Sequence, residues 1–594
     1  MSGSTFAEKI LCARRGEVVT AAPDLILSHD NSASIAKTFS SMGGGRVRYP
    51  ERLVITLDHN APPTNAALAN DYQAVRTFVA EQGLTHFHDA GSGICHQLMA
   101  EHARPGMLIA GSDSHTCTAG AFNTLAVGID RTETAGLWLS GRTWFRVPET
   151  LRVILTGKLP TWVFAKDLAT HLIGMLGADG ANYLSIEFHG PGVDTLGLAE
   201  RMTLCNLASE MGAKNAVFPA DAILAKALGP TCGSGMFGDE DADYLRTVEL
   251  DLCKIVPLVA CPHAVDNVRS LSEVVGTPIH QCFLGTCSNG RLEDLALAAK
   301  ILAGKHIAPG VQFLVTPASR DVFLAALRAG IIATLVEAGA CILSASCGPC
   351  LGTGQGIPAD GWNVLSTANR NFKGRMGNKT ANIYLASPAV VAMSALQGAI
   401  TDPRPGNPRD HFEVQRRQTH AVPLPLTHDR RHGGILDLSD LDDLNTDLMF
   451  AGNLTYQIKS SDPAAIVPHL FEAVIPGFGA MLKPGDVILA GENFGCGSSR
   501  EHPAVGLRHA GVAAVVVKSA ARIFYRAAIN QGLLLLVCPE AVTAYRPGHI
   551  LALDLQAGWI EVGSQRFPIP RLTGTVADIL AAGGLKSYLS PGRT

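Results

Sequence analysis

The sequence lacks any apolar run of about 18 residues, so we expect no transmembrane helix. Its first segment, MSGSTFAEKILCARRGE, places charges where a secretory signal requires a continuous apolar stretch. An excess of basic residues is also missing, because 48 Lys and Arg stand against 52 Asp and Glu and the formal net charge is -4. We therefore expect a cytoplasmic protein with neither a membrane nor a nucleic-acid partner.

Short-period repeats are absent too, and charged residues make up only 17% of the chain against 47% hydrophobic residues. A chain of 594 residues is too long for one hydrophobic core, so several domains are expected. The 61 Gly and 33 Pro imply many turns. This composition is typical of a multi-domain α/β enzyme.

Short apolar runs alternate with amphipathic stretches over most of the chain. The runs include DLILSHD, RLVITLDH, GMLIAGSDSH and LRVILTGKLP, and each ends in polar residues. In open α/β sheets, ligands bind at the carboxyl ends of the strands. By position alone, the candidate site residues are therefore His29, Asp58, His59, Asp113, Ser114 and His115.

The composition of the sequence changes at residues 401–436, where DPRPGNPRDHFEVQRRQTHAVPLPLTHDRRHGG is rich in Pro, Arg and His. Little periodicity remains there, so we interpret the segment as a linker. The block that follows has strand signals of its own, DVILAGENF and GVAAVVVK. The chain is thus predicted to combine a large multi-domain α/β body, a linker and a smaller α/β domain.

Clustered cysteines stand out among the 14 in the chain. The segments CFLGTCSNGRLEDLALAAKIL and SCGPCLGTG offer Cys287, Cys347 and Cys350 as ligands, the last two at CxxC spacing on a loop rich in Gly and Pro. Such a loop lets backbone amides approach sulfides and thiolates closely. We expect most other cysteines to be small buried hydrophobes, and six have no partner at ligand spacing: Cys12, Cys205, Cys232, Cys253, Cys261 and Cys538.

Three interpretations of the cysteine group remain open on spacing alone. A CxxC pair can be a redox dithiol, but the thioredoxin-like context is missing. A zinc site usually takes four ligands, and a fourth Cys or His at ligand spacing is not evident. A 4Fe-4S cluster on three cysteines leaves one iron open to water or substrate, which favours Lewis-acid chemistry over electron transfer.

Five motifs together resemble the aconitase superfamily, in the family's order and across nearly the whole chain. They are GSDSHTCTAG, LGTCSNGRLEDL, CGPCLGTG, STANRNFKGRMG and ENFGCGSSREH. GRTWFRVPET, AEKIL and DLILSHD resemble the isopropylmalate and homoaconitate branch more than citrate aconitases. The C-terminal block is similar to the small subunit of those enzymes, which here is fused to the large one.

The resemblance implies an α/β, aconitase-like fold with three α/β domains around an iron–sulfur cluster and a fourth, swivelling domain. We place the first three domains at residues 1–148, 149–254 and 255–400, and the small-subunit-like domain at 437–594. The fusion removes the need for a separate small subunit, and a monomer is compatible with it.

The resemblance also implies a reaction, in which a 2- or 3-hydroxy acid is dehydrated to an enoate and rehydrated with the hydroxyl moved. One 4Fe-4S cluster with an open iron would be held by Cys287, Cys347 and Cys350. A carboxylate fixes the tautomer of a histidine and raises its basicity, which suits the acid role. By similarity, the pairs are Asp58 with His59, Asp113 with His96 and Glu187 with His115, and His59 is the expected acid.

The base implied by the resemblance is Ser498, whose alkoxide would need backbone amides and a nearby cation. Gly495, Gly497 and Arg500 offer both, although a serine cap on an ordinary helix would explain the motif without chemistry. Arginine suits substrate carboxylates because its planar fork binds them with two bonds. The expected substrate-binding residues are His29, Ser114, Asn369, Arg370, Arg375, Asp447, Ser499 and Arg500.

One loop departs from the family's pattern. After NTD the chain reads LMFAGNLTYQIKSSDP, with Asn453 where relatives usually carry an arginine and Leu454 where they carry a tyrosine. Phe450 and Leu454 are candidates for an apolar pocket, and Lys459 is a candidate partner for a carboxylate. A missing arginine disfavours a third carboxylate. We therefore expect isopropylmalate or a related alkylmalate as substrate.

Other functions stay open as alternatives. Within the enzyme class, aconitate or homoaconitate hydration is the second hypothesis. Some aconitase relatives become RNA-binding iron sensors when the cluster is lost, but the complete motif set and the lack of a basic run argue against that role. An inert protein with a structural cluster is the third alternative.

Overall fold

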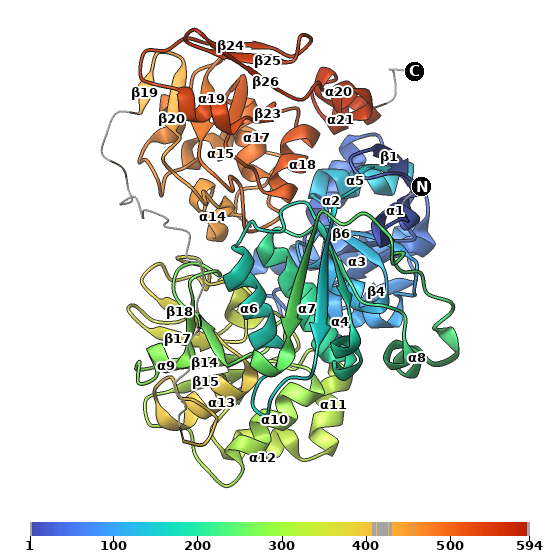
Figure 1. Ribbon diagram of the computed structural model, residues 1–594, viewed down its shortest axis with the longest axis vertical. Helices are drawn as coiled ribbons and strands as arrows, with labels where there is room; N and C mark the ends of the chain where they lie inside the picture. The colour runs from blue at the N-terminus through green and yellow to red at the C-terminus, as the bar shows by residue number, and fades with distance from the viewer. Residues whose placement is uncertain (1–2, 407–411, 413–425, 427–429, 456, 591–594) are drawn as a thin grey trace.

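The computed structural model describes residues 3–406, 412, 426, 430–455 and 457–590, except the side chain of Asn453. Most of the predicted linker at 401–436 therefore lies outside the described residues. Figure 1 shows the C-terminal segment (orange to red) lying over a larger body (blue to yellow). None of the helices among these residues has the length and apolar character that a membrane crossing requires.

The first sheet is parallel and has the order β4-β3-β2-β5-β6. Four of its strands are buried along their whole length, as expected of parallel strands covered on both faces. Its strands are β2 (Leu25–Ser28), β3 (Leu53–Thr56), β4 (His86–His88), β5 (Leu108–Gly111) and β6 (Leu125–Gly128). Helices in this part are α1 (Phe6–Leu11), α2 (Ser32–Ser41), α3 (Ala66–Gln82), α4 (Cys95–Leu98) and α5 (Arg131–Ser140).

Two short strands, β1 (Val18–Ala21) and β7 (Thr143–Arg146), form an antiparallel pair beside this sheet. The second main sheet is parallel with the order β10-β9-β8-β11. It consists of β8 (Thr150–Thr156), β9 (Ser185–His189), β10 (Asn215–Val217) and β11 (Arg246–Asp251). The helices α6 (Ala165–Leu176), α7 (Leu198–Ala208) and α8 (Ala222–Leu228) belong to this part.

The third sheet has seven strands in the order β13-β12-β18-β17-β14-β15-β16. Its strands are β12 (Leu258–Ala260), β13 (Val268–Ser270), β14 (Gln281–Leu284), β15 (Gln312–Val315), β16 (Cys341–Ile342), β17 (Asn363–Ser366) and β18 (Asn382–Leu385). The helices are α9 (Leu271–Val274), α10 (Leu292–Leu302), α11 (Arg320–Arg328), α12 (Ile331–Glu337) and α13 (Pro388–Gln397).

The C-terminal segment contains a five-stranded sheet of order β19-β20-β21-β22-β23 and a separate antiparallel three-stranded sheet. The strands are β19 (Arg431–His432), β20 (Ile435–Leu438), β21 (Val487–Ala490), β22 (Ala514–Val517), β23 (Leu535–Val537), β24 (Leu551–Asp554), β25 (Trp559–Val562) and β26 (Gln565–Pro568). The helices are α14 (Thr446–Met449), α15 (Pro463–Ile466), α16 (Phe478–Met481), α17 (His502–His509), α18 (Arg522–Asn530), α19 (Pro539–Ala544), α20 (Gly574–Ala581) and α21 (Leu585–Leu589).

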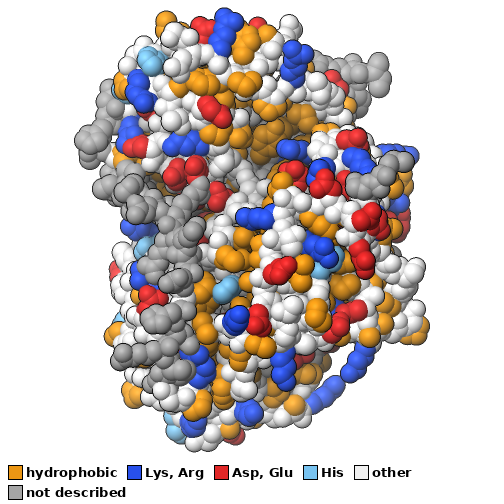
Figure 2. Space-filling model, in the orientation of Figure 1, with side chains coloured by type: hydrophobic (Ala, Val, Ile, Leu, Met, Phe, Trp, Pro, Cys, Tyr) orange, Lys and Arg blue, Asp and Glu red, His pale blue; other side chains and the backbone are white. Residues whose placement is uncertain are grey.

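A buried polar and apolar seam joins the C-terminal segment to α5 and β7. The Arg526 guanidinium pairs with Glu133 on α5 and donates to the carbonyl oxygen of Trp144 at 2.7 Å. Trp144 also packs against Ile529 and residues of α20 and α21 in one hydrophobic cluster. On the face seen in Figure 2, hydrophobic side chains show in a hollow between the C-terminal segment and the larger body. The seam holds the two parts close enough to enclose a common cavity.

Candidate active site

One cavity collects most of the residues that the sequence singles out. It lies between the larger body and the C-terminal segment and is lined by residues of both. Asp58 and Asp447 stand behind it, bonded to lining side chains. The predicted residues that line it are His29, His59, His96, Asp113, Ser114, His115, Cys287, Cys347, Cys350, Asn369, Arg370, Arg375, Ser498, Ser499 and Arg500.

Strand ends deliver these side chains. His29 follows β2, His59 follows β3, and Ser114 follows β5 of the same parallel sheet. Cys287 follows β14 and Asn369 follows β17, which are neighbours in the third sheet. The carboxyl ends of parallel strands meet at one sheet edge, so residues far apart in sequence reach the same cavity.

Asp58 and His59 form the predicted pair. His59 Nδ1 lies 2.7 Å from Asp58 Oδ1, and the other oxygen of this fully buried carboxylate accepts the backbone N–H of Cys95 at 2.7 Å. The His59 ring stacks on His29, with ring centroids 4.0 Å apart. Burial, followed by the charge of His59, lowers the pKa of His29 to about 3, so His29 is neutral near neutral pH.

Asp113 and His96 form the second predicted pair. His96 Nε2 lies 2.7 Å from Asp113 Oδ1, which also accepts the backbone N–H of His115 at 2.7 Å. Asp113 Oδ2 lies 3.5 Å from His59 Nε2. Although burial raises it, the pKa of Asp113 is held well below its usual value by His96 and by bonds from His115, His59 and His96. Asp113 thus ties the two histidine pairs into one network.

The predicted pairing of Glu187 with His115 is wrong. Glu187, on β9, points to the N-terminal segment, where it accepts the backbone N–H of Phe6 at 2.7 Å and the Tyr244 hydroxyl at 3.1 Å. His115 Nε2 instead lies 2.7 Å from Glu210 Oε1. Both oxygens of Glu187 have partners away from the cavity, so Glu187 is a structural residue.

Glu210 is a site residue that the sequence analysis missed. Its second oxygen accepts Nε–H of Arg370 at 3.0 Å, so one carboxylate holds His115 and Arg370 together. Burial raises the pKa of Glu210, but Arg370 and His115 outweigh it and hold the pKa at about 2. No sequence motif marks Glu210, because it follows α7 at the end of an ordinary helix.

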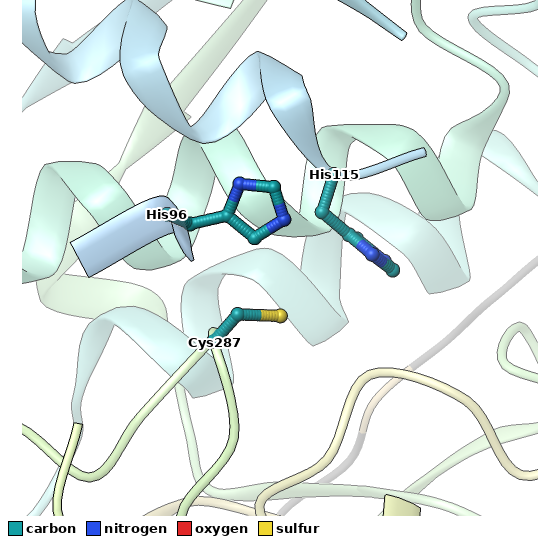
Figure 3. A group of neighbouring side chains, drawn as sticks. All are labelled: His96, His115 and Cys287. Carbon is teal, nitrogen blue, oxygen red and sulfur yellow. The ribbon is translucent and has the colours of Figure 1, made fainter. Parts of the chain in front are cut away.

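The three predicted cysteines all line the cavity, and the sulfurs of two of them have N–H donors nearby. Asn369 Nδ2 lies 3.2 Å from Cys287 Sγ, and the Arg375 guanidinium lies 3.7 Å from Cys350 Sγ. Cys287 Sγ and the ring nitrogens of His96 and His115 lie within 4.8 Å of one another; Figure 3 shows this group. Cysteine thiolates that face one cavity, with N–H groups that can donate to sulfur, are suited to holding an iron–sulfur cluster.

Ser498 stands on a turn that glycine makes possible. Gly495 and Gly497 have φ of 79° and 96°, and a Cβ on Gly495 would meet the Phe524 ring at 2.3 Å. Ser498 Oγ lies 3.0 Å from Thr446 Oγ1, which also accepts the Ser498 backbone N–H at 3.1 Å. Helix α17 begins only at His502, so the alternative that the serine is an ordinary helix cap is wrong.

Arginines in the cavity differ in whether a carboxylate neutralises them. Arg370 pairs with Glu210, and its second donor reaches Ser114 Oγ at 3.0 Å. Arg500 pairs with Asp447 at 2.9 Å and donates to the Phe450 carbonyl oxygen at 2.7 Å. Asp447 therefore orients Arg500 and does not line the cavity itself.

The departing loop does not have the arrangement predicted for it. Phe450 is a buried core residue whose ring stacks on His502 with centroids 4.9 Å apart. Leu454 packs against the same core, and Lys459 forms an ion pair with Asp71 at 2.8 Å. The side chain of Asn453, on which the substrate prediction rests, lies outside the described residues.

Further residues line the cavity that the sequence analysis did not name. The loop presents Gly452 and Thr455, and the first residue of α5, Arg131, faces the same space. Arg131 follows β6 as His29 follows β2, so the strand-end rule was a signal that could have found it. The remaining lining residues are Asn31, Ile94 and Leu351.

Both the larger body and the C-terminal segment match a known protein family in sequence. Residues 6–398 match the aconitase family (aconitate hydratase), and residues 483–541 match the aconitase C-terminal domain. The chain is 44% identical to 3-isopropylmalate dehydratase large subunit 1 of Methanopyrus kandleri over 415 residues, 68% of this chain and 99% of that protein. It is 46% identical to the probable methanogen homoaconitase large subunit of Methanosarcina mazei over 389 residues, 64% of this chain and 98% of that protein.

A solved 3-isopropylmalate dehydratase from Methanocaldococcus jannaschii is 36% identical to this chain. The matched region covers 26% of this chain and 90% of that chain, and the TM-score is 0.24.

Proposed function

This chain belongs to the aconitase family, and we propose that it is a hydro-lyase that isomerises a hydroxy acid with a malate core at a 4Fe-4S cluster. The observation that carries the proposal is the cavity shared by three cysteines, three carboxylate-bound histidines, Ser498 and three predicted arginines. Cys287, Cys347 and Cys350 would hold the cluster. Bound there with one iron free of protein ligands, the cluster supplies a Lewis acid for the departing hydroxyl.

His59 is proposed to protonate the departing oxygen. Its Nδ1 is held by Asp58 at 2.7 Å, which leaves Nε2 to carry the transferable proton. The backbone N–H of Cys95 binds the other Asp58 oxygen, so the carboxylate that orients the ring is itself held in place. An acid positioned in this way contributes about 10²- to 10⁴-fold to the rate.

Ser498 is proposed to remove the proton alpha to a carboxylate. Its hydroxyl has Thr446 as a hydrogen-bond partner at 3.0 Å, and the tight glycine turn brings the backbone close to the cavity. Arg500, two residues on, lines the same cavity and adds positive charge. Such charge favours a serine alkoxide over the neutral hydroxyl.

Arg370 and Arg375 are proposed to bind the two carboxylates of the malate core. Arg370 is held in place by Glu210 and Ser114. Arg375 has no carboxylate at ion-pair distance among the residues that the structure describes, and its buried Nε has no hydrogen-bond partner there. A buried guanidinium without an anion is costly, so its role is to receive one from the substrate.

Two classes of substrate, which differ in the third substituent on the malate core, need to be compared. The relatives are named for isopropylmalate, whose third substituent is uncharged, and for homoaconitate, a tricarboxylate. Alkylmalates remain the first substrate class predicted from the sequence. Tricarboxylates, the substrates of the alternative aconitate or homoaconitate hydration, are the second class.

The test is an anaerobic assay of enoate formation by ultraviolet absorbance, after reconstitution with iron and sulfide. We expect turnover of at least one member of the series isopropylmalate, other alkylmalates, homocitrate and citrate. Ser498→Ala should abolish turnover while the cluster's visible spectrum is retained. An intact cluster without turnover of any of these acids would refute the proposed function.

A further inference from the structure

Arg131 brings a positive charge to the cavity from an unexpected place. It is the first residue of α5, it is half-buried, and it lines the cavity together with His29, Gly452 and Thr455. These neighbours include the two described residues of the departing loop that face the cavity. Arg131 therefore lies beside the loop that departs from the family's pattern.

Arg131 has no anionic partner in the described part of the protein. Arg370 and Arg500, in contrast, are paired with Glu210 and Asp447. The carboxylate of Asp130, next in sequence, is turned away from the cavity and accepts bonds from Glu133 N–H and Asn530 Nδ2. An anion supplied by the substrate would complete the site.

The position of Arg131 on the helix is unfavourable by itself. The N-terminal end of an α-helix carries a partial positive charge, so an arginine in the first turn is destabilising. The guanidinium of Arg500 lines the same cavity, so the two like charges also repel each other. A locally unfavourable charge that faces a cavity is characteristic of a functional residue.

The residues on both sides of Arg131 are anchored across the seam. Asp130 Oδ2 accepts Nδ2–H of Asn530 at 2.5 Å, and Thr132 Oγ1 donates to Glu501 Oε2 at 2.7 Å. The Thr132 backbone N–H donates to the same oxygen at 3.2 Å. Because both anchors belong to the C-terminal segment, the contact between the two parts fixes where Arg131 stands.

A second polar group at this place also lacks a partner. The buried His29 Nδ1 has no hydrogen-bond partner among the described residues, although its ring stacks on His59 and lines the cavity. Lys459, the cation that the sequence offered instead, is already paired with Asp71. Arg131 and His29 are thus the groups available to a third polar substituent.

We propose that Arg131 forms a subsite for a carboxylate on the third substituent of the malate core, so that the preferred substrate is a hydroxy-tricarboxylate. This inference rests on the proposed function and narrows its substrate class. A guanidinium binds a carboxylate through two parallel N–H···O bonds, which an alkyl group cannot accept. An alkylmalate would leave Arg131 without an anion.

The kinetic test compares homocitrate and citrate with isopropylmalate in the reconstituted holoenzyme. Arg131→Gln removes the charge, and Arg142→Gln, an exposed arginine just beyond the same helix, is the matched control. We expect the wild type to prefer a tricarboxylate. Arg131→Gln should lower the ratio of kcat/KM for the tricarboxylate to that for isopropylmalate by about 10- to 100-fold, the effect of one charged hydrogen bond. Arg142→Gln should not change this ratio.

A binding test separates this inference from the proposed function. Calorimetry with tricarballylate, a tricarboxylate without a hydroxyl group, requires no turnover. Wild-type protein should bind it about 10- to 100-fold more tightly than Arg131→Gln does, and Arg142→Gln should match the wild type. Equal affinity in all three proteins, or an equal loss for isopropylmalate and tricarboxylates in the kinetic test, would overturn the assignment of Arg131. Tight binding without turnover would overturn the proposed reaction and support the subsite.

Discussion

The carboxylate of Glu210 lies 2.7 Å from His115 Nε2, across 95 residues of sequence. Its other oxygen holds Arg370, which in turn donates to Ser114 Oγ. Glu210 therefore links a histidine of the site to a proposed substrate-binding arginine. Glu187, which the family resemblance suggested for this place, is occupied with Phe6 and Tyr244.

Replacement of Glu210 tests this link. Glu210→Gln keeps the shape of the side chain but leaves the buried Arg370 charge uncompensated, so we expect kcat/KM to fall by about 10- to 100-fold. Glu187→Gln is the matched control, because it should lower Tm through the lost bonds to Phe6 and Tyr244 while kcat/KM stays near the wild-type value. A larger kinetic loss in Glu187→Gln than in Glu210→Gln would contradict the corrected pairing.

Asp58→Asn tests the acid. The amide cannot stabilise a protonated His59 and favours the wrong tautomer, so kcat should fall by about 10²- to 10⁴-fold. The cluster's spectrum should be retained, since Asp58 holds His59 and is not one of the proposed cluster ligands. Steady-state kinetics and visible absorbance on the same sample provide the comparison, and activity equal to the wild type would exclude His59 as the acid.

Serine substitutions test the cluster ligands. Cys287→Ser, Cys347→Ser and Cys350→Ser should each lose most of the iron and sulfide after anaerobic reconstitution, because a thiolate ligand is removed. Cys341→Ser is the control, since this cysteine is exposed and outside the cavity. Iron and sulfide analysis measures the result. Full cluster content in any of the three variants would remove that cysteine from the ligand set.

Asp130 makes the seam sensitive to pH. Burial, followed by the charges of Glu133 and Glu501, raises the pKa of Asp130 from 3.8 to about 7. Between these values the folded protein binds more protons than the unfolded chain, so this group's contribution to stability falls as the pH rises from 3.8 to about 7.

The isosteric variant Asp130→Asn removes this titration. The Tm of the wild type minus that of Asp130→Asn should therefore be largest at acidic pH and decrease as the pH rises to about 7. Thermal melts of both proteins in a pH series measure the difference. A difference that stays constant or grows with pH would mean that Asp130 is not protonated in the folded protein.

Local pattern was enough to find one side of the cavity. Asp58 and His59 are adjacent in sequence and follow the buried strand β3, so both their pairing and their place at a strand end were predictable. Asp113 with His96, and the cysteines, were predictable through motifs whose spacing reflects the chemistry they perform. The neighbours of a residue in the chain and the ends of predicted strands can both be read directly from a sequence.

Contacts between distant segments were not predictable in this way. Nothing near Glu210 marks it as the partner of His115, and nothing near Lys459 marks Asp71, from which 388 residues separate it. Glu187 lies on a strand and Glu210 follows a helix. Whether Glu187 or Glu210 binds His115 depends on which of the two side chains points toward the cavity. That orientation is decided by packing between sheets, which a single sequence does not display.

The sequence alone determined the α/β class, the family and the set of chemical groups, because strand periodicity and motif order are written along the chain. Only the tertiary structure decided which arginines of the site are paired with a carboxylate. Arg370 and Arg500 are neutralised by carboxylates from other segments, whereas Arg131 reaches the cavity through the seam formed with residues about 370–400 positions away. The physical reason is that charge compensation depends on distance in space, and burial at a closed seam makes each such pairing strong.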